Sequence, residues 1–383
     1  MPPLLIYTDA YQRFDYGPSH PLQVKRLKLT VDLIRAYGLL DKRRARMLET
    51  RPATEAEVLT YHTWDYLQVL KEINHGSGGG DLSLYGIGPG DNPVFPGVLD
   101  WALYCAGGAL QAGEWVASGR GPVAFHIAGG MHHAHKSCAA GFCYLNDPVL
   151  VIQYLQSLGK RVAYIDIDAH HGDGVQEAFY QNREVLTVSF HQNGRTLFPS
   201  TGFVSEMGAG KGLGYSVNVP LHPWTDDAIF IGVFDQIVPP LLRVFRPDVL
   251  VTQLGVDSFY NDPLANLSLT TRGFCHAVRF FQALKIPWVA LGGGGYEMVN
   301  VARAWTLAWS IMLGRELGPE RLPEDFRKIL RPLEAADEWL RDEDYQEKEA
   351  HWQRANAEAR AVVRAIQDAI FPYFNIFGYG QWM

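Results

Sequence analysis

Cysteine is scarce in this sequence, with four residues in 383. None forms a CxxC pair with another, and so few cysteines exclude a disulfide-stapled scaffold. The sequence also lacks any run near the roughly 18 unbroken apolar residues that span a membrane. The first nine residues have neither the basic region nor the apolar core of a signal peptide, and they are typical of a first strand. These absences predict a reduced, cytoplasmic protein with no membrane partner.

Positive charge is limited as well, because Lys and Arg number 34 against 41 Asp and Glu, for a formal net charge of −7. A nucleic-acid binder requires a basic face, so we expect no nucleic-acid partner. An acidic balance is compatible with a cationic partner such as a lysine-rich peptide. The glycine runs lack the Lys-Ser/Thr ending of a phosphate loop, which argues against a nucleotide site.

Apolar content is high, at 47% of the chain, and it alternates between two patterns. Short β-branched runs predict strands at Leu4–Tyr7, Val123–Ile127, Val162–Ile167, Val185–Phe190, Val249–Leu254 and Trp288–Leu291. Longer amphipathic segments predict helices at Leu22–Tyr37, Gly97–Gly119, Pro148–Leu158, Asp226–Phe245, Thr270–Leu284 and Val299–Leu313. This alternation predicts an α/β fold with a mostly parallel central sheet and helices on both of its faces.

Chemically active residues follow four of the predicted strands. His132 and His133 follow the second strand, and an Asp- and His-rich run from Asp166 to Asp173 follows the third. Asp257 follows the fifth strand, and four glycines and Tyr296 follow the sixth. Ligands of open α/β sheets bind beyond the carboxyl ends of the strands. We therefore expect these residues to converge on one rim of the sheet.

The run from Asp166 to Asp173 is typical of a metal site, because buried carboxylates are costly unless they are paired or bound to a cation. Asp168, His170 and Asp257 would supply three protein ligands, which is the usual number for a catalytic zinc ion. The same donor set also suits iron(II) or another first-row metal. The number of ligands is what favours zinc.

Two further features predict acid–base chemistry. The neighbouring His132 and His133 can move protons near neutral pH, and Asp166 and Asp173 are available to orient their rings. Tyr296, after its glycines, can donate a hydrogen bond to a developing oxyanion.

Four segments together resemble the histone deacetylase family, specifically its class I-like and bacterial deacetylase-like or acetoin-utilisation members. They are Gly129–Asn146, Asp166–Tyr180, Gln253–Asp257, and Gly292–Tyr296 with Ala302–Trp305. Weaker similarity extends from about His20 to about residue 315. The resemblance implies an arginase/deacetylase-like fold in a single domain over residues 1–383. Its catalytic core spans about 1–315, and a helical C-terminal segment with an aromatic tail spans about 316–383.

The same resemblance implies a zinc-dependent deacetylase that hydrolyses N6-acetyl-lysine in proteins or peptides. His133 would be general base and then general acid, oriented by Asp173, while His132 and Asp166 would stabilise charge. Tyr296 would polarise the acetyl carbonyl. The implied substrate-binding residues are Asp91 on the rim, Gly141, Phe142 and Phe198 along a tunnel, and Leu264 at its mouth.

Two further sites are implied by the family alone. Arg26 and Cys143 match the lining of an internal pocket below the metal. Structural potassium is implied at two sites: one formed by Asp166, Asp168, His170, Ser189 and Phe190, and another near Phe179, Asn182, Val185 and Tyr215.

Three alternative functions stay open at this point. A two-manganese ureohydrolase shares the strand-end motif, and a non-catalytic acyl-lysine binding module shares the tunnel. Acetylpolyamines are the rival substrates, although family members that prefer them carry an acidic gate where this chain has Leu264. The aromatic tail from Phe371 to Trp382 either packs on the body or forms a contact between subunits.

Overall fold

Eight strands form one sheet in the computed structural model, which describes residues 2–76, 80–330, 338–343, 345 and 347–377. Every pairing between neighbouring strands is parallel, in the order β2-β1-β3-β8-β7-β4-β5-β6. The strands are β1 Leu4–Ile6, β2 Arg46–Leu48, β3 Val123–His126, β4 Val162–Asp166, β5 Val185–Gln192, β6 Ser216–Leu221, β7 Val249–Gln253 and β8 Trp288–Leu291. The predicted α/β fold with a parallel sheet is therefore confirmed.

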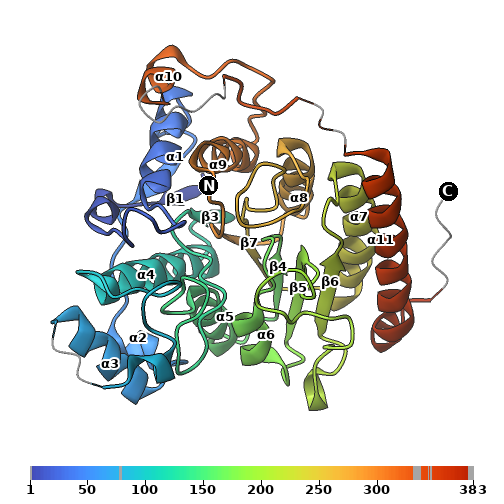
Figure 1. Cartoon of the computed structure of the whole chain (residues 1–383), viewed down its shortest axis with the longest axis horizontal. Helices are drawn as coiled ribbons and strands as arrows, with labels where there is room; N and C mark the ends of the chain where they lie inside the picture. The colour runs from blue at the N-terminus through green and yellow to red at the C-terminus, as the bar shows by residue number, and fades with distance from the viewer. Residues whose placement is uncertain (1, 77–79, 331–337, 344, 346, 378–383) are drawn as a thin grey trace.

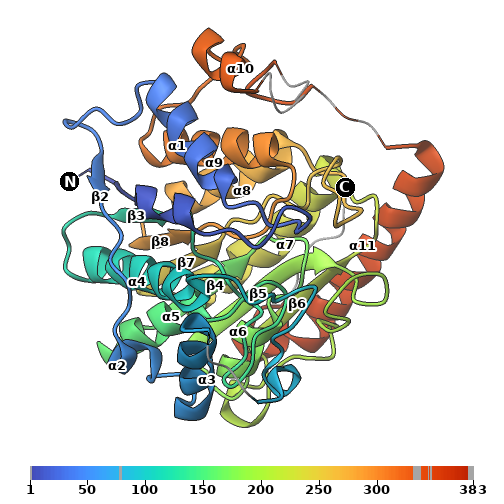
Figure 2. The same ribbon diagram turned by 60° about the vertical axis from the view of Figure 1, so that its left-hand side comes forward.

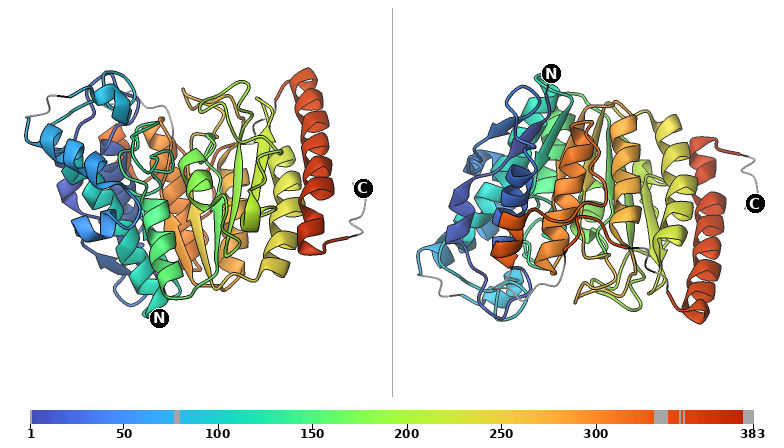
Figure 3. Two further views of the ribbon diagram at one scale, coloured as in Figure 1. Left: turned by 90° about the horizontal axis from the view of Figure 1, so that it is seen from below. Right: turned by 90° about the horizontal axis from the view of Figure 1, so that it is seen from above.

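The central strands are buried along their whole length because helices cover both faces of the sheet. The helices are α1 Lys25–Ala36, α2 Glu55–Val58, α3 Trp64–Asn74, α4 Val98–Ala117, α5 Asp147–Ser157, α6 Asp173–Phe179, α7 Asp227–Phe245, α8 Thr271–Ala283, α9 Met298–Met312, α10 Glu324–Leu330 and α11 Glu349–Ala369. Helices α4 and α5 pack together on one face, and α1, α9, α8 and α7 form a row on the other (Figures 2 and 3).

Two strands were not predicted from the sequence, and both lie at the edges of the sheet. All three residues of β2 are exposed, so no buried apolar run marks it. Strand β6 contains Asn218 and Pro220, which argue against a strand in the sequence. Proline is tolerated there because an edge strand need not donate every backbone N–H to a neighbour.

The boundaries of the predicted helices agree with the structure to within three residues, and side-chain caps explain several of them. Asn146 precedes α5 and accepts a hydrogen bond from the backbone N–H of Val149. Asp226 precedes α7 and accepts one from Ile229. Such caps satisfy the free N–H groups of a first helical turn. Helices α3 and α6 lie in segments for which the sequence pattern predicted no helix.

Helix α7 is apolar and long enough to cross a membrane by length and composition, with a mean hydropathy of 1.6 over its best window. More than half of that window, 56%, is buried inside the protein. Helix α7 packs between α8 and α11 (Figure 1), which accounts for its apolar composition.

The C-terminal segment contains α10 and α11, in agreement with its charged helical pattern. Helix α11 packs against α7 and β6, and the ring of Phe374 lies 5.1 Å from that of Tyr215. The first part of the aromatic tail therefore packs on the body. Phe377 is 74% exposed, and the end of the tail, including Trp382, lies outside the described residues. A subunit contact through the tail stays a prediction.

Candidate active site

The four strand ends that carry chemically active residues belong to neighbouring strands. The order β3-β8-β7-β4 places the segments after His126, Leu291, Gln253 and Asp166 side by side. Since all four strands are parallel, their carboxyl ends meet at one edge of the sheet. Their order in the sheet differs from their order in the chain, so residues more than a hundred positions apart share one site.

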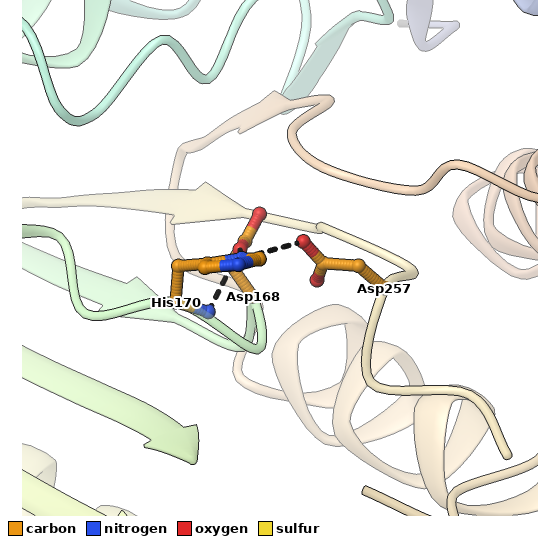
Figure 4. A group of neighbouring side chains, drawn as sticks. All are labelled: Asp168, His170 and Asp257. Atoms are coloured by element: carbon orange, nitrogen blue, oxygen red, sulfur yellow. Dashed lines mark hydrogen bonds and ion pairs between the residues drawn. The ribbon is translucent and has the colours of Figure 1, made fainter. Parts of the chain in front are cut away.

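Asp168, His170 and Asp257 form a buried cluster at this edge. One ligand atom from each lies within 4.8 Å of the others. Nδ1 of His170 is 3.0 Å from Oδ2 of Asp257 and 3.2 Å from Oδ1 of Asp168. Figure 4 shows the His170 ring facing Asp257, with Asp168 beside it. Two carboxylates and one imidazole converging in a buried site form a donor set that fits a divalent metal ion.

The surrounding backbone holds these carboxylates in place. Asp168 accepts hydrogen bonds from the N–H of Gly294 at 2.7 Å and from the amide of Gln253 at 2.6 Å. Asp257 accepts one from the N–H of Ala169 at 2.7 Å. A Cβ atom on Gly294 would lie 2.1 Å from Oδ2 of Asp257, so this close approach requires glycine. Gln253 was not predicted to take part, although its motif also contains Asp257.

All three side chains of this cluster are buried, and their mutual interactions shift their pKa values. Burial lowers the pKa of His170, but hydrogen bonds and charge from Asp168 and Asp257 outweigh burial and raise it to about 10. Burial and the charge of Asp168 raise the pKa of Asp257 to about 6. The pKa values of His170 and Asp257 are both raised, as expected at a site with an excess of negative charge. A bound cation would neutralise this charge.

His132 and His133 lie beside this cluster as two histidine–carboxylate pairs. Nδ1 of His132 donates to Asp166 at 2.8 Å, and Nδ1 of His133 donates to Asp173 at 2.7 Å. The Nε2 atoms of the two rings are 3.0 Å apart and share one proton between them. The family resemblance implied the same pairs, His132 with Asp166 and His133 with Asp173. The structure brings these four side chains together.

The two rings differ in basicity. Burial lowers the pKa of His132, but Asp166 and Asp168 outweigh this effect and raise it to about 9. Burial and the neighbouring positive charge of His132 lower the pKa of His133 to about 4. His132 therefore carries the shared proton, and His133 is the neutral ring, whose Nε2 lone pair accepts the hydrogen bond from His132. A neutral imidazole is the form that accepts a proton.

The backbone around this histidine pair is held by two residues that the sequence analysis did not identify. The buried carboxylate of Asp147 accepts hydrogen bonds from the N–H groups of Gly130 and Met131. The side chain of Asn146 donates to the carbonyl oxygens of His132 and Ala134, at 3.2 and 2.8 Å. The sequence did contain a signal for these two residues, because an Asn-Asp pair at the start of a helix is a typical cap sequence.

Tyr296 lies across the site from the histidines. Its ring centroid is 6.4 Å from that of His170 and 5.7 Å from that of Phe142. Its backbone N–H donates to the buried carboxylate of Asp262 at 2.8 Å, an anchor that the sequence did not suggest. Burial and the nearby charge of Asp257 raise the pKa of the Tyr296 hydroxyl well above its usual range. The phenol therefore keeps its proton and can donate a hydrogen bond.

A cavity of about 210 Å³ leads to these residues. It is lined by Asp91, His133, Gly141, Phe142, His170, Leu197, Phe198, Leu264 and Tyr296. All five predicted substrate-binding residues contribute to this lining, together with Leu197, which was not predicted. A cavity of this volume with two phenylalanine walls suits an extended apolar chain.

Gly141 allows the rings of His133 and Phe198 to lie close to the backbone at the cavity wall. Its backbone has a φ of +50°, and a Cβ atom there would lie 2.4 Å from Cδ2 of His133 and 3.0 Å from the ring of Phe198. Any larger residue would therefore push one of these two rings away. The next residue, Phe142, is held by its carbonyl oxygen, which accepts a hydrogen bond from Tyr16 at 2.8 Å.

Arg26 and Cys143, predicted to line an internal pocket, are both buried. The guanidinium of Arg26 donates to the carbonyl oxygens of Gly293 and Gly295, both at 2.7 Å, and so holds the glycine run before Tyr296. Burial lowers the pKa of Arg26 and raises that of the Cys143 thiol. These contacts place Arg26 next to the active site, and the internal pocket itself stays a prediction.

The residues predicted to bind potassium are only partly brought together. Asp166 and Ser189 are paired neighbours on β4 and β5, and Phe190 follows on β5. The N–H of Asn182 donates to the carbonyl of Phe179 at 2.9 Å, just before Val185 begins β5. Tyr215 lies next to Ser216 at the start of β6, and its carbonyl accepts a hydrogen bond from Thr187. Both potassium sites stay predictions.

A cluster that fits a metal ion, next to paired histidines and an apolar cavity, is the arrangement expected of a metal-dependent hydrolase. Residues 20–312 match the family described as the histone deacetylase domain. The chain belongs to this family, whose members are hydrolases that act on acetylated amides.

Several relatives support this assignment. The acetoin utilization protein AcuC of Bacillus subtilis (strain 168) is 40% identical over 333 residues, covering 84% of each chain. Histone deacetylase 1 of Homo sapiens is 39% identical over 320 residues, covering 83% of this chain and 65% of the human protein. The crystal structure of an HDAC homolog from Aquifex aeolicus has a TM-score of 0.87 at 35% identity, covering 96% of this chain and all of the other. An HDAC homolog complexed with SAHA has a TM-score of 0.88 at 35% identity.

Proposed function

We propose that this protein is a zinc-dependent deacetylase that hydrolyses N6-acetyl-lysine in proteins or peptides. The observation that carries the proposal is the cavity of about 210 Å³ that is lined by Phe142 and Phe198 together with His133, His170 and Tyr296. Its two phenylalanine walls suit the four methylene groups of a lysine side chain, and its histidines and tyrosine suit an acetyl amide at the floor.

Zinc is proposed on the basis of the donor set. Asp168, His170 and Asp257 would hold the ion, with iron(II) as the alternative metal. When bound, such an ion supplies a Lewis acid for the carbonyl and lowers the pKa of water. Potassium near Ser189 and near Asn182 is proposed only as a structural ion.

The histidine pair would move the protons of the reaction. His133, neutral and held by Asp173, accepts a proton from the attacking water and later gives it to the departing lysine amine. His132, positively charged and held by Asp166, stabilises the negative charge that develops at the carbonyl oxygen. Tyr296 donates a hydrogen bond to the same oxygen. Asp91, at the mouth of the cavity, would bind backbone N–H groups of the substrate.

The acidic net charge is consistent with a lysine-bearing substrate, and we propose a cytoplasmic location with no nucleic-acid or membrane partner. Family membership argues against the ureohydrolase and against a binding module without catalysis. Acetylpolyamines remain the second candidate substrate, because the same cavity would accept their apolar chain.

Replacing Tyr296 with Phe tests the proposed chemistry. The variant keeps the ring that packs on Phe142 but removes the hydroxyl, so kcat on an acetyl-lysine peptide is expected to fall about 10²- to 10³-fold. The assay uses zinc-loaded protein and a peptide whose released lysine is quantified. A Tyr373→Phe variant, altered at a distant exposed tyrosine, is the matched control. Equal activity in Tyr296→Phe and wild-type protein would rule out the role proposed for this hydroxyl.

Replacing Leu264 with Glu tests the choice of substrate. A carboxylate at the mouth of the cavity would attract the distal ammonium group of an acetylpolyamine, so its kcat/KM is expected to rise about tenfold relative to an acetyl-lysine peptide. Leu264→Gln has similar size without charge and separates electrostatic from steric effects. If wild-type protein already prefers acetylpolyamines over every acetyl-lysine peptide, the second candidate replaces the first.

A further inference from the structure

His171 follows the proposed metal ligand His170, but the proposed reaction gives it no role. Its ring is buried and bonds at both nitrogens. Nδ1 lies 2.8 Å from Oγ1 of Thr201, and Nε2 lies 3.2 Å from Oε1 of Gln176. This one ring therefore connects the segment that carries His170 to α6 and to the loop after β5.

The directions of these hydrogen bonds follow from Gln176. Its amide nitrogen donates to Glu206 at 2.8 Å, so its Oε1 atom is the one that faces His171 and can only accept. Nε2 of His171 must therefore carry a proton. In the neutral ring, Nδ1 is then the acceptor and the Thr201 hydroxyl is its donor. Thr201 is thus the first member of a series of hydrogen bonds that continues through His171 and Gln176 to Glu206.

Glu206 also forms hydrogen bonds with the backbone of the same loop. Its carboxylate accepts hydrogen bonds from the N–H groups of Gly202 and Phe203, both at 3.0 Å. The carbonyl of Gly202 accepts one from His191 at 2.9 Å. Gly202 has a φ of +83°, and a Cβ atom there would lie 2.7 Å from Cγ of His171, so the loop passes directly against this ring. Residues 201–203 are thus bonded directly to His171 and to β5, and through Glu206 to Gln176 on α6.

This anchor lies three residues from Phe198, one wall of the cavity. The Phe198 ring is 5.0 Å from that of His133 and 6.5 Å from that of His170, and the residue is 42% exposed. Because the Phe198 ring is so exposed, its own packing contributes little to fixing its position. A hydrogen bond from the N–H of Ser200 to the carbonyl of Leu197 connects the Phe198 turn to the anchored residues.

We propose that Thr201, His171, Gln176 and Glu206 form a positioning network that fixes the place of Phe198 and thereby the contact between the cavity wall and the methylene groups of the substrate lysine. The inference rests on the proposed deacetylase function and assigns these residues to substrate selection. His171 is a positioning residue in this scheme, because it acts through Thr201 and the loop and does not contact the substrate.

Replacing Thr201 with Val tests the network, since valine has nearly the same shape but cannot donate to His171. Loss of one hydrogen bond is expected to raise KM for an acetyl-lysine peptide about three- to tenfold, with a much smaller change in kcat. The ratio of acetyl-ornithine to acetyl-lysine kcat/KM is expected to rise, because a stem one methylene shorter has less contact with Phe198 to lose. Amide hydrogen exchange should become faster in residues 197–203. Thr201→Ser keeps the hydroxyl and is expected to restore the wild-type ratio.

The controls separate this proposal from its alternatives. Thr60→Val, at an exposed threonine on α2's C-terminal side, should leave both the ratio and the exchange unchanged. An unchanged ratio and unchanged exchange in Thr201→Val would overturn the proposal, and so would an equal loss on both substrates with reduced metal content. If wild-type protein hydrolyses no acyl-lysine peptide, the proposed function fails, and exchange in residues 197–203 alone then decides whether the anchor exists.

Discussion

Asp257→Asn protein is expected to lose at least about a thousandfold in kcat, because a metal ion supplies several kcal/mol of charge stabilisation to the transition state. Asparagine has the size of aspartate but no charge. If its oxygen still accepts from Ala169, its amide nitrogen faces His170 and repels a cation. Removing the metal from wild-type protein with a chelator is expected to have the same effect, with recovery on adding Zn²⁺.

Metal content and stability provide readouts that are independent of activity. Elemental analysis is expected to find one ion per wild-type chain and far less in Asp257→Asn. Metal at 1,000 times its Kd should stabilise the folded wild-type protein by about 4 kcal/mol, and this gain should be largely absent in the variant. Asp235→Asn, which alters an exposed carboxylate bonded to His276, is the matched control. Full activity without metal, or two manganese ions per chain with urea released from a guanidino substrate, would contradict the proposed site.

His133→Ala protein is expected to lose about 10²- to 10⁴-fold in kcat with little change in KM, because the general base and acid is removed while the cavity is retained. Exogenous imidazole should recover part of the activity, since it can occupy the space left by the ring. His276→Gln, on the exposed face of α8, is the control for the loss of a histidine elsewhere.

Asp173→Asn provides a sharper test of the same role. The carboxylate now holds the proton of His133 on Nδ1, so Nε2 is the nitrogen that can accept a proton. An amide in its place can donate to Nδ1 and so favours the wrong tautomer, which is expected to lower kcat as strongly as His133→Ala does. The charge of Asp173 also raises the pKa of His133, so its removal should move the acid limb of the kcat/KM profile to lower pH. An unchanged pH profile together with wild-type kcat would assign the proton transfer to another group.

Much of this site could be predicted from the sequence because its key residues sit in short contiguous motifs. Asp166, Asp168 and His170 alternate along one strand end, and this spacing alone directs them to a common region. The apolar runs of the central strands likewise predicted a buried parallel sheet. Strand β2 was not predicted because all of its residues are exposed, and β6 was not predicted because Asn218 and Pro220 interrupt its apolar pattern although the strand is buried.

The sequence by itself determined the secondary-structure elements of the core and the chemistry available at each strand end, since both depend on neighbouring residues. Only the tertiary structure decided that β3, β8, β7 and β4 lie side by side, because strand order is set by the packing of distant segments. The same is true of Asn146 and Asp147 behind the histidine pair, and of the network through His171. Hydrogen bonds between such distant side chains depend on the folded arrangement, and no local pattern specifies them.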